Sequence, residues 1–255
     1  MPGYHGYFLW HELMTTDPAG AKAFYPAALG WGVMPGGIPD FDYDMWTTDR
    51  GPIGGCMELP QQARDMGAPS HWIAYVGTSD IEATFALAGS KGCGTYVPIT
   101  PIPEIGRFAV LADPAGATFA IYQPDSPAGD EAKPQIGDFS WHELATTDVP
   151  AALAFYGELF GWQEVEAHDM GPMGTYYLFG RDGRVFGGMF NKPESMPMPP
   201  NWLCYVRVPG AEDAAAAVSA AGGRILNGPM EVPGGDRTAQ CMDPQGAAFA
   251  VHWMP

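Results

Sequence analysis

The stretch that decides the fold is Trp10-His11-Glu12-Leu13-Met14-Thr15-Thr16-Asp17, because it recurs as Trp141-His142-Glu143-Leu144-Ala145-Thr146-Thr147-Asp148. Residues 10–31 and 141–162 are identical at 13 of 22 positions, and both windows end in Gly-Trp. Further along, Asp113-Pro114-Ala115-Gly116-Ala117 corresponds to Asp243-Pro244-Gln245-Gly246-Ala247. Similarity within one chain at a fixed spacing indicates an internal repeat. The chain is therefore predicted to be a tandem duplication.

Each copy opens with the same local pattern, which is clearest around Asp17. Residues 7–15 have the character of a strand. Asp17 predicts a helix N-cap with Pro18 at the first helical position, and Gly30 is expected to end that helix. Pro26 lies inside the run and is expected to kink or shorten the helix, because proline lacks a backbone donor. Short strands are predicted at about 43–48 and 53–59.

The same order of elements begins again inside each half. In the first half we expect a strand at 71–77, a helix at 80–89, and strands near 95–98, 106–112 and 117–122. In the second half we expect a strand at 202–208, a helix at 211–221, and strands up to Val251. This order gives four βαβββ units with mixed sheets, which is an α+β fold.

Two domains are predicted from this repeat. The first covers residues 1–123 and the second covers residues 139–255, with two βαβββ units in each. Residues 124–138 are polar and rich in turn-forming residues, which is typical of a linker.

The composition restricts the partners and the compartment. The 255 residues include 12 Lys and Arg against 29 Asp and Glu, for a net charge of −17. Such a chain repels phosphate backbones and anionic lipid surfaces, so neither nucleic acid nor a membrane is an expected partner. No apolar run approaches the length of about 18 residues that a spanning helix needs.

The cysteines and the N-terminus favour a cytoplasmic protein. Cys56, Cys93, Cys204 and Cys241 lie far apart and form no Cys-x-x-Cys pair, so disulfides and a thiolate zinc site are not expected. We interpret them as small buried side chains in a reducing compartment. The first residues lack the basic and apolar regions of a signal peptide.

Three motifs together resemble a known family. They are the strand-Thr-Thr-Asp-helix start, the glycine pairs Gly54-Gly55 and Gly187-Gly188, and Asp-Pro-x-Gly-Ala before the last strand of each half. With them the chain resembles the vicinal oxygen chelate superfamily over nearly its whole length. That superfamily includes glyoxalase I, bleomycin-resistance proteins and extradiol dioxygenases, and the two-domain glyoxalase-like members are most similar. The resemblance implies curled sheets whose concave faces form ligand clefts. It does not fix one activity, because proteins with this fold catalyse unrelated reactions or only bind drugs.

The resemblance also implies where a metal would bind. Metal-dependent members carry His or Gln on the first strand of a unit and Glu on its last strand, and these hold Fe, Zn, Ni or Mn. The matching positions on first strands are Trp10 and Trp141, with Trp72 or Ile73 and Trp202 or Leu203 in the other two units. Those on the last strands are Ala120 and Ala250. None of these side chains coordinates a cation. The last strand of the first unit does end in a carboxylate, Glu58, but its counterpart in the other half is Asn191. The usual ligand set is therefore missing and no cofactor is expected, with a divalent metal as the alternative.

Glu12 and Glu143 are the predicted catalytic residues. Strand residues alternate between two faces, so a cleft that contains Trp10 also contains Glu12, while His11 faces the helix. A carboxyl group against an aromatic wall has a raised pKa, as a general acid or base requires. The structural alternative is that each glutamate pairs with an arginine of its own half, Arg107 or Arg237.

The remaining candidates are predicted to bind the ligand or, as the alternative, to serve the structure. The aromatic wall is predicted to consist of Trp10, Trp46, Tyr75, Tyr122, Trp141, Tyr205 and His252, although aromatic residues on strands are also typical of a core. Arg107 and Arg237 follow turns, and they are expected either to attract an anionic ligand to a cleft mouth or to hold a hairpin.

Three hypotheses for function follow from these residues. The favoured one is a metal-free protein that sequesters or transforms a small aromatic or carbonyl compound by acid/base chemistry. The second is a metal-dependent lyase or dioxygenase whose shifted ligands are drawn from His11, Glu58, His142 and His252, together with Glu12 and Glu143. A one-residue strand bulge would turn the histidines toward the cleft. The third is a non-catalytic interaction module. The resemblance leaves monomer and homodimer open, because many relatives build clefts across chains.

Overall fold

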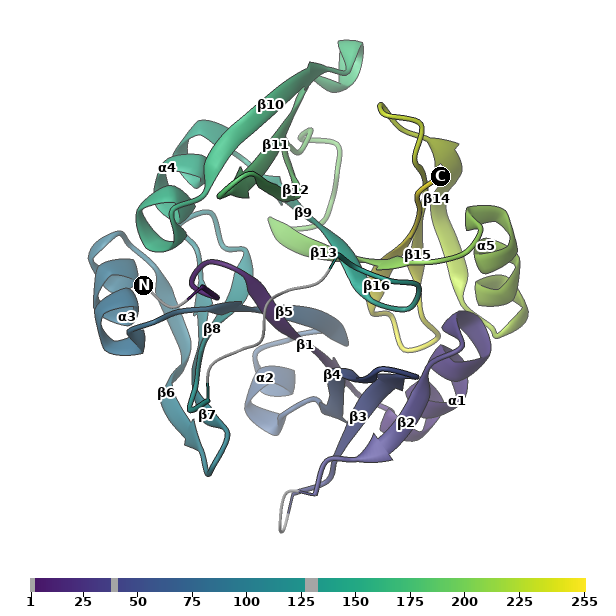
Figure 1. The fold of residues 1–255 in the computed structure, drawn as a ribbon, viewed down its shortest axis with the longest axis horizontal. Coiled ribbons are helices and arrows are strands. Elements are labelled where there is room, and N and C mark those ends of the chain that lie inside the picture. Colours follow the sequence, from purple (N-terminus) through teal and green to yellow (C-terminus); the bar gives the residue numbers. More distant parts are fainter. Residues whose placement is uncertain (1–2, 38–40, 127–132) are drawn as a thin grey trace. The chain divides into compact units, whose positions relative to one another are not determined.

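The computed structural model describes residues 3–37, 41–126 and 133–255, so the middle of the predicted linker, 127–132, lies outside the described residues. Figure 1 shows the elements. Those of the first half are β1 Phe8–Thr15, α1 Pro18–Leu29, β2 Gly32–Pro35, β3 Tyr43–Thr48, β4 Gly51–Glu58, α2 Gln61–Asp65, β5 His71–Gly77, α3 Ile81–Ser90, β6 Gly94–Ile102, β7 Gly106–Ala112 and β8 Thr118–Pro124. Those of the second half are β9 Phe139–Thr146, α4 Val149–Phe160, β10 Gln163–Asp169, a 3-10 turn Gly171–Met173, β11 Thr175–Arg181, β12 Arg184–Asn191, β13 Asn201–Arg207, α5 Ala211–Ala220, β14 Arg224–Glu231, β15 Arg237–Met242 and β16 Ala248–Trp253.

The strands form two eight-stranded mixed sheets with the same topology. The first sheet has the order β2-β3-β4-β1-β5-β8-β7-β6, and the second has the order β10-β11-β12-β9-β13-β16-β15-β14. The pairs β1–β4 and β5–β8 are parallel, whereas β3–β4 and β7–β8 are antiparallel. Each quarter of the chain therefore contributes one βαβββ unit, and the predicted α+β class is confirmed. The helix α2 was not predicted.

Helix α1 begins as its sequence predicts but does not stop early. The side chain of Asp17 accepts a hydrogen bond from the backbone N–H of Gly20, and Gly30 ends the helix with a φ of 73°. The helix continues through Pro26 to Leu29 and has 12 residues, as many as α4, which has Gly157 at the matching position. The expected shortening at Pro26 is therefore wrong. Proline removes one backbone bond, and the packed face of the helix compensates for that loss.

The chain forms two compact units, and each unit contains segments of both halves. Unit 1 contains residues 1–9, 74–132 and 142–202, and unit 2 contains residues 10–73, 133–141 and 203–255. Strands β1, β5, β9 and β13 pass from one unit to the other. The first sheet takes its strands from residues 8–124 and the second takes its strands from residues 139–253. The division into domains at the linker stays a prediction.

The core of each unit contains the same buried tyrosine–aspartate pair. In unit 2, Tyr25 on α1 donates to Asp243 Oδ2 over 3.0 Å and accepts from Trp72 Nε1 over 2.8 Å. In unit 1, Tyr156 on α4 donates to Asp113 Oδ2 over 3.0 Å and accepts from Trp202 Nε1 over 3.0 Å. The other oxygen of each aspartate accepts backbone N–H groups of its own turn. The repeated Asp-Pro-x-Gly-Ala motif thus anchors a helix of the other half.

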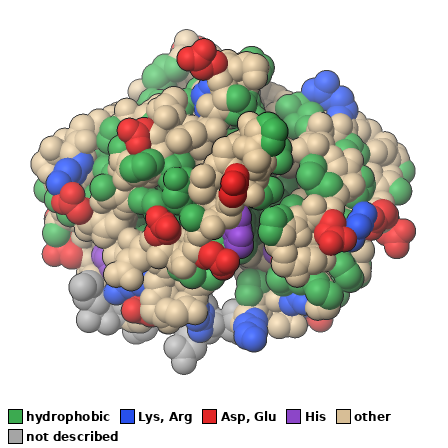
Figure 2. Space-filling view, turned by 90° about the horizontal axis from the view of Figure 1, so that it is seen from above, with side chains coloured by type: hydrophobic (Ala, Val, Ile, Leu, Met, Phe, Trp, Pro, Cys, Tyr) green, Lys and Arg blue, Asp and Glu red, His purple; other side chains and the backbone are tan. Residues whose placement is uncertain are grey.

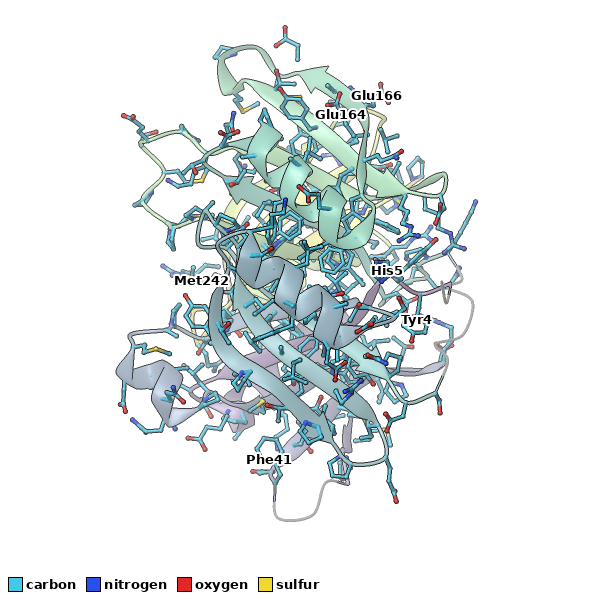
Figure 3. All side chains as sticks on the ribbon, turned by 90° about the vertical axis from the view of Figure 1, so that its left-hand side faces the viewer. Tyr4, His5, Phe41, Glu164, Glu166 and Met242 are labelled. Atoms are coloured by element: carbon cyan, nitrogen blue, oxygen red, sulfur yellow. The ribbon has the colours of Figure 1, made fainter. Side chains whose placement is uncertain are left out.

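Charged side chains lie on the surface of the described residues. On the face in Figure 2, acidic side chains are scattered among hydrophobic and neutral ones. Glu164 and Glu166 extend from β10, one of the two edge strands of the second sheet (Figure 3). Charges on an edge strand oppose its pairing with another chain. Among the described residues, no helix has the length and apolar character needed to cross a membrane.

Candidate functional site

Three polar side chains of unit 2 form a chain of hydrogen bonds on one face of β1. Trp10 Nε1 donates to the hydroxyl of Tyr43 over 3.0 Å, and that hydroxyl donates to Glu12 Oε2 over 3.0 Å. His11 instead stacks on Phe139, with ring centroids 3.7 Å apart and planes inclined by 16°. Strand alternation therefore places Trp10 and Glu12 together, as predicted, and separates His11 from them.

Burial makes the Glu12 carboxyl unusual. Its residue is only 4% exposed, and Oε1 has no hydrogen-bond partner among the described residues. Desolvation by burial raises the pKa of Glu12 from its ordinary value of 4.5 to about 8, although the hydrogen bonds from Tyr43 and Trp10 act in the opposite direction. The group is therefore mostly protonated at neutral pH and has a proton to donate.

A glycine on the neighbouring strand makes room for this arrangement. Strand β4 pairs with β1 so that Gly55 lies opposite Glu12. A Cβ at Gly55 would collide with the Tyr43 hydroxyl and with Glu12 Oε1. The second residue of the repeated glycine pair is thus required by the close approach of two side chains.

Unit 1 contains a second copy of the pair. Tyr176 donates its hydroxyl hydrogen to Glu143 Oε2 over 2.9 Å, and Gly188 lies opposite Glu143 in the β9–β12 register. A Cβ at Gly188 would collide with the Tyr176 ring. Neither tyrosine was predicted as a site residue. Their equivalent places in the two halves could have indicated them, because Tyr43 and Tyr176 are 133 residues apart, the same spacing as Gly55 and Gly188.

Three of the predicted ligand-binding residues lie together in unit 2. The ring centroid of His252 is 6.2 Å from that of Trp141 and 6.4 Å from that of Tyr205, and both pairs meet edge to face. His252 Nδ1 lies 3.0 Å from Ser140 Oγ, and Nε2 lies 2.9 Å from Asp236 Oδ2. His252 is therefore buried and held at both ring nitrogens.

Two other predicted residues form an aromatic group in unit 1. Tyr75 lies 6.4 Å from Tyr122 and 5.9 Å from Phe108 between ring centroids. The hydroxyl of Tyr122 donates to the backbone oxygen of Ile105 over 3.1 Å. The strands thus bring Tyr75 and Tyr122 together, which the sequence alone did not establish.

The prediction that Trp46 lines a cleft requires correction. Trp46 is completely buried in the core of unit 2, with its ring 5.1 Å from Tyr25 and 5.8 Å from Trp31. It lies three residues after Tyr43 on the same strand, so its side chain projects from the opposite face. That face is the one that α1 covers.

The two arginines hold helices rather than the predicted glutamates. Arg107 pairs with Glu82 in the first turn of α3 and also donates to Gln123. Arg237 pairs with Glu212 in the first turn of α5 and with Glu231 on its own hairpin. The alternative in which Arg107 neutralises Glu12 is therefore wrong, since Glu12 accepts from a tyrosine hydroxyl and Arg107 pairs with Glu82.

The residues at the usual metal positions of the family do not fit a metal. Trp72 and Trp202 donate to core tyrosines, so strand alternation places Ile73 and Leu203 on the opposite face. Ala120 pairs with Tyr75, and Ala250 pairs with Tyr205. Indole and aliphatic side chains provide no ligand atom for a divalent cation.

Two residues of the shifted ligand set, Glu58 and His142, differ in their exposure. Glu58 is exposed and accepts from Arg64 Nη2 over 2.8 Å. His142 is buried, stacks on Phe8 at 3.5 Å, and has Nδ1 3.2 Å from the backbone oxygen of Phe186. Burial lowers the pKa of His142 to about 3, so its imidazole is neutral, the form that binds metals.

One pair of buried ligand types does come together in unit 2. A ring nitrogen of His11 and Sγ of Cys204 lie within 4.8 Å of each other. Imidazole and thiolate are ligands that zinc accepts. Burial raises the pKa of Cys204 to about 12, so the metal would have to displace the thiol proton. Cys204 is a free thiol, as are Cys56, Cys93 and Cys241.

Comparison with known proteins places these features in a family. The sequence profile described as "Glyoxalase/Bleomycin resistance protein/Dioxygenase superfamily" matches residues 138–251. A Mycobacterium tuberculosis protein that is named as a glyoxylase, CFP32, is 30% identical over 244 residues, which cover 95% of this chain and 92% of that protein. The chain belongs to this superfamily. The resemblance inferred from the sequence motifs is thereby confirmed.

Other proteins are similar to most of this chain. The anthracycline biosynthesis protein DnrV of Streptomyces peucetius is 28% identical over 253 residues, which cover 95% of this chain and 91% of that protein. A trihydroxybiphenyl dioxygenase of Sphingomonas wittichii has a TM-score of 0.68 at 14% identity and covers 98% of this chain and 90% of its own. A Mn(II)-bound glyoxalase of Novosphingobium aromaticivorans has a TM-score of 0.63 at 14% identity, with 98% and 82% covered. At such low identity the two structures show the shared fold alone.

Proposed function

We propose that this member of the superfamily binds a small carbonyl or aromatic compound at Glu12 and transforms it by acid/base chemistry, without a metal at the positions usual in the family. The observation that supports the proposal is the state of Glu12 Oε1. It is a buried carboxyl oxygen without a partner among the described residues, and its group has a pKa of about 8. Unpartnered buried polar atoms are costly, so their retention favours a role toward a ligand.

The hydrogen-bond chain determines which oxygen carries the proton. Oε2 accepts from Tyr43, so the proton of the neutral acid lies on Oε1. From there it would be donated to a carbonyl or hydroxyl oxygen of the ligand. When the proton leaves, the bond from Tyr43 stabilises the carboxylate, and the bond from Trp10 Nε1 stabilises the Tyr43 oxygen. Glu12 would then act as the base that recovers a proton.

Substitution of Glu12 tests the proposal. Carbonyl and phenolic compounds are first screened for stabilisation of the full chain, since a ligand of the folded state raises its apparent stability. Glu12→Gln keeps the shape of the side chain but has no acidic proton, and we expect it to lose turnover, or binding if the protein only sequesters, by about a hundredfold. The matched control is Glu58→Gln, which changes an exposed carboxylate. Full activity in Glu12→Gln would contradict the proposal.

A second candidate function is a metal-dependent lyase or dioxygenase, and the proximity of His11 and Cys204 favours it. It predicts near-stoichiometric Fe, Zn, Ni or Mn in protein purified without a chelator, and loss of that metal in Cys204→Ala. Activity that survives chelation would exclude it. The non-catalytic alternative predicts that the screen finds no ligand at all.

A further inference from the structure

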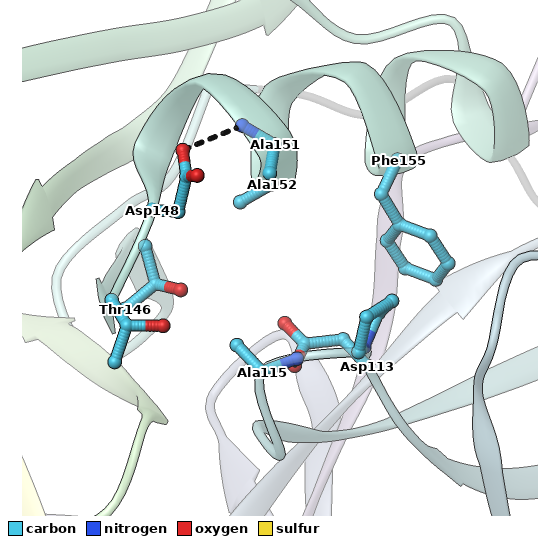
Figure 4. A pocket seen from close by; sticks show the side chains of 9 residues that line it. Asp113, Ala115, Thr146, Asp148, Ala151, Ala152 and Phe155 are labelled. Atoms are coloured by element: carbon cyan, nitrogen blue, oxygen red, sulfur yellow. Dashed lines mark hydrogen bonds between the residues drawn. The ribbon is translucent and has the colours of Figure 1, made fainter.

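Unit 1 contains a cavity of about 190 Å³ that the proposed acid/base chemistry does not use. It lies between the turn after β7 and the start of α4, and Figure 4 shows Asp113 and Ala115 on one side and Thr146 and Asp148 on the other. Phe155, also on α4, contributes an aromatic ring to the wall. The lining is mainly apolar, with a few polar groups, which is the composition of small-molecule sites.

Thr146 carries a buried hydroxyl group whose hydrogen-bonding capacity is not satisfied by the described residues. Its residue is fully buried, and Oγ1 has no hydrogen-bond partner within the described part of the chain. The equivalent threonine in unit 2, Thr15, has its Oγ1 3.4 Å from Ser70 Oγ and accepts the backbone N–H of Asp17 over 3.3 Å. A hydroxyl that is satisfied in one copy is therefore left without a partner in the other, beside a cavity.

The same place in unit 2 is filled by the chain itself. In the aligned halves of the sequence, Gln245 is equivalent to Ala115 of unit 1, and Gly20 is equivalent to Ala151. A Cβ at Gly20 would lie 2.5 Å from Gln245 Nε2, so the glutamine amide rests against the start of α1. The cavity in unit 1 therefore arises because alanine replaces a side chain of four more heavy atoms.

The charges around the cavity restrict its ligand. Asp113 is buried, and its Oδ1 accepts from the N–H groups of Ala115 and Ala117 while Oδ2 accepts from Tyr156. Asp148 Oδ1 is bonded to the N–H of Ala151 over 3.0 Å. These two carboxyl groups disfavour an anion. Both oxygens of Asp113 already accept hydrogen bonds, and Asp148 is exposed to water, which screens its charge, so a neutral ligand is favoured over a cation as well.

Size and chemistry together specify the ligand class. An apolar cavity of about 150 Å³ in another protein holds benzene. We propose that this cavity binds a neutral one-ring molecule with a single hydroxyl group, which bonds to Thr146 Oγ1 while the ring packs against Phe155. The site is distinct from Glu12 and contains no residue of the proposed acid/base pair.

Phenol and toluene provide the test, because they have similar size and differ in the hydroxyl group. Both are titrated into the ¹⁵N-labelled full chain, and the amide signals of Ala151 and Ala152 are followed. We expect phenol to shift these signals and to bind about tenfold more tightly than toluene. Thr146→Val, which keeps the side-chain shape, should remove that preference. A preference that persists in Thr146→Val, or phenol that leaves α4 unperturbed, would overturn the assignment.

The other copy supplies matched variants. Ala115→Gln with Ala151→Gly reproduces the filled arrangement of unit 2 and should weaken phenol binding at least about tenfold. Gln245→Ala changes the equivalent position of unit 2 and should leave the Ala151 and Ala152 response intact. Glu12→Gln should also leave it intact, so failure of the acid/base proposal and failure of this one are separable. Tighter binding of benzoate or benzylamine than of phenol would refute the argument for a neutral ligand.

Discussion

Tyr43 donates its hydroxyl hydrogen to Oε2 of Glu12 over 3.0 Å, and Tyr176 stands in the same relation to Glu143 over 2.9 Å. The two pairs occupy equivalent places in the two halves of the duplicated chain. In each pair a glycine of the neighbouring strand leaves space for the tyrosine.

Glu12 should make the stability of the protein depend on pH. Its pKa rises from 4.5 to about 8 on folding, so the folded state holds this proton more tightly than the unfolded state. Its contribution is complete below about pH 4.5 and is lost as the pH rises through about 8. We expect a loss of up to about 1.4 kcal/mol in unfolding free energy per pH unit in this window. Glu12→Gln should remove that part of the slope. Urea unfolding at several pH values measures it, with Glu58→Gln as the control that keeps the slope.

Tyr43→Phe should raise the pKa of Glu12 further. The hydroxyl of Tyr43 donates to the carboxylate, which favours the charged form, and its removal leaves burial unopposed by that bond. Titration of the ¹³C-labelled side-chain carboxyl by NMR gives the value directly. Tyr176→Phe serves as the control, because Tyr176 bonds to Glu143. A Glu12 pKa that falls in Tyr43→Phe would show that the hydrogen bond is not formed.

Gly55→Ala should destabilise the protein by about 1–3 kcal/mol, since the new methyl group must displace Tyr43 and Glu12. The loss should be accompanied by loss of ligand binding at Glu12. Gly89→Ala is the matched control. Gly89 lies in α3, a Cβ there meets no atom within 4 Å, and alanine is the better helix former. Equal stability of the two variants would contradict the close packing at Gly55.

Tyr25→Phe should cost about 2–4 kcal/mol in unfolding free energy, because it leaves Asp243 Oδ2 and Trp72 Nε1 buried without their partner. Tyr156→Phe should cost a similar amount in unit 1, where Asp113 and Trp202 lose theirs. Denaturant unfolding monitored by fluorescence measures both losses. Tyr96→Phe, at a tyrosine that is 46% exposed, should be nearly neutral. A neutral Tyr25→Phe would mean that water replaces the hydroxyl.

The fold could be predicted because its signals are local and occur twice. Asp17 and Gly30 bound a helix by their own conformational preferences, and strand alternation alone places Trp10 beside Glu12. Local patterns did not reveal the contact of Tyr43 with Glu12, since it depends on the pairing of β3, β4 and β1 across 31 residues of chain. Only the equivalent place of Tyr176 in the second half marks Tyr43 in the sequence. Trp46 was predicted on the wrong side for the same reason, because its face is fixed by where α1 packs. The cavity beside Thr146 exists because Ala115 has only a methyl group where Gln245 has a long side chain. No sequence motif marks such a difference in length.

The buried tyrosine–aspartate pairs have a consequence for the duplication itself. Tyr25 belongs to the first half of the chain and Asp243 to the second, whereas Tyr156 belongs to the second half and Asp113 to the first. The tyrosine of each half thus donates a hydrogen bond to the aspartate of the other half. A fragment that ended at residue 126 would retain Tyr25 and Asp113 but would lack Asp243 and Tyr156, and only another molecule could supply these two residues. Between separate molecules the tyrosine–aspartate contact would be lost on dilution. Because the two copies are fused, the contact is made within one chain and does not depend on protein concentration.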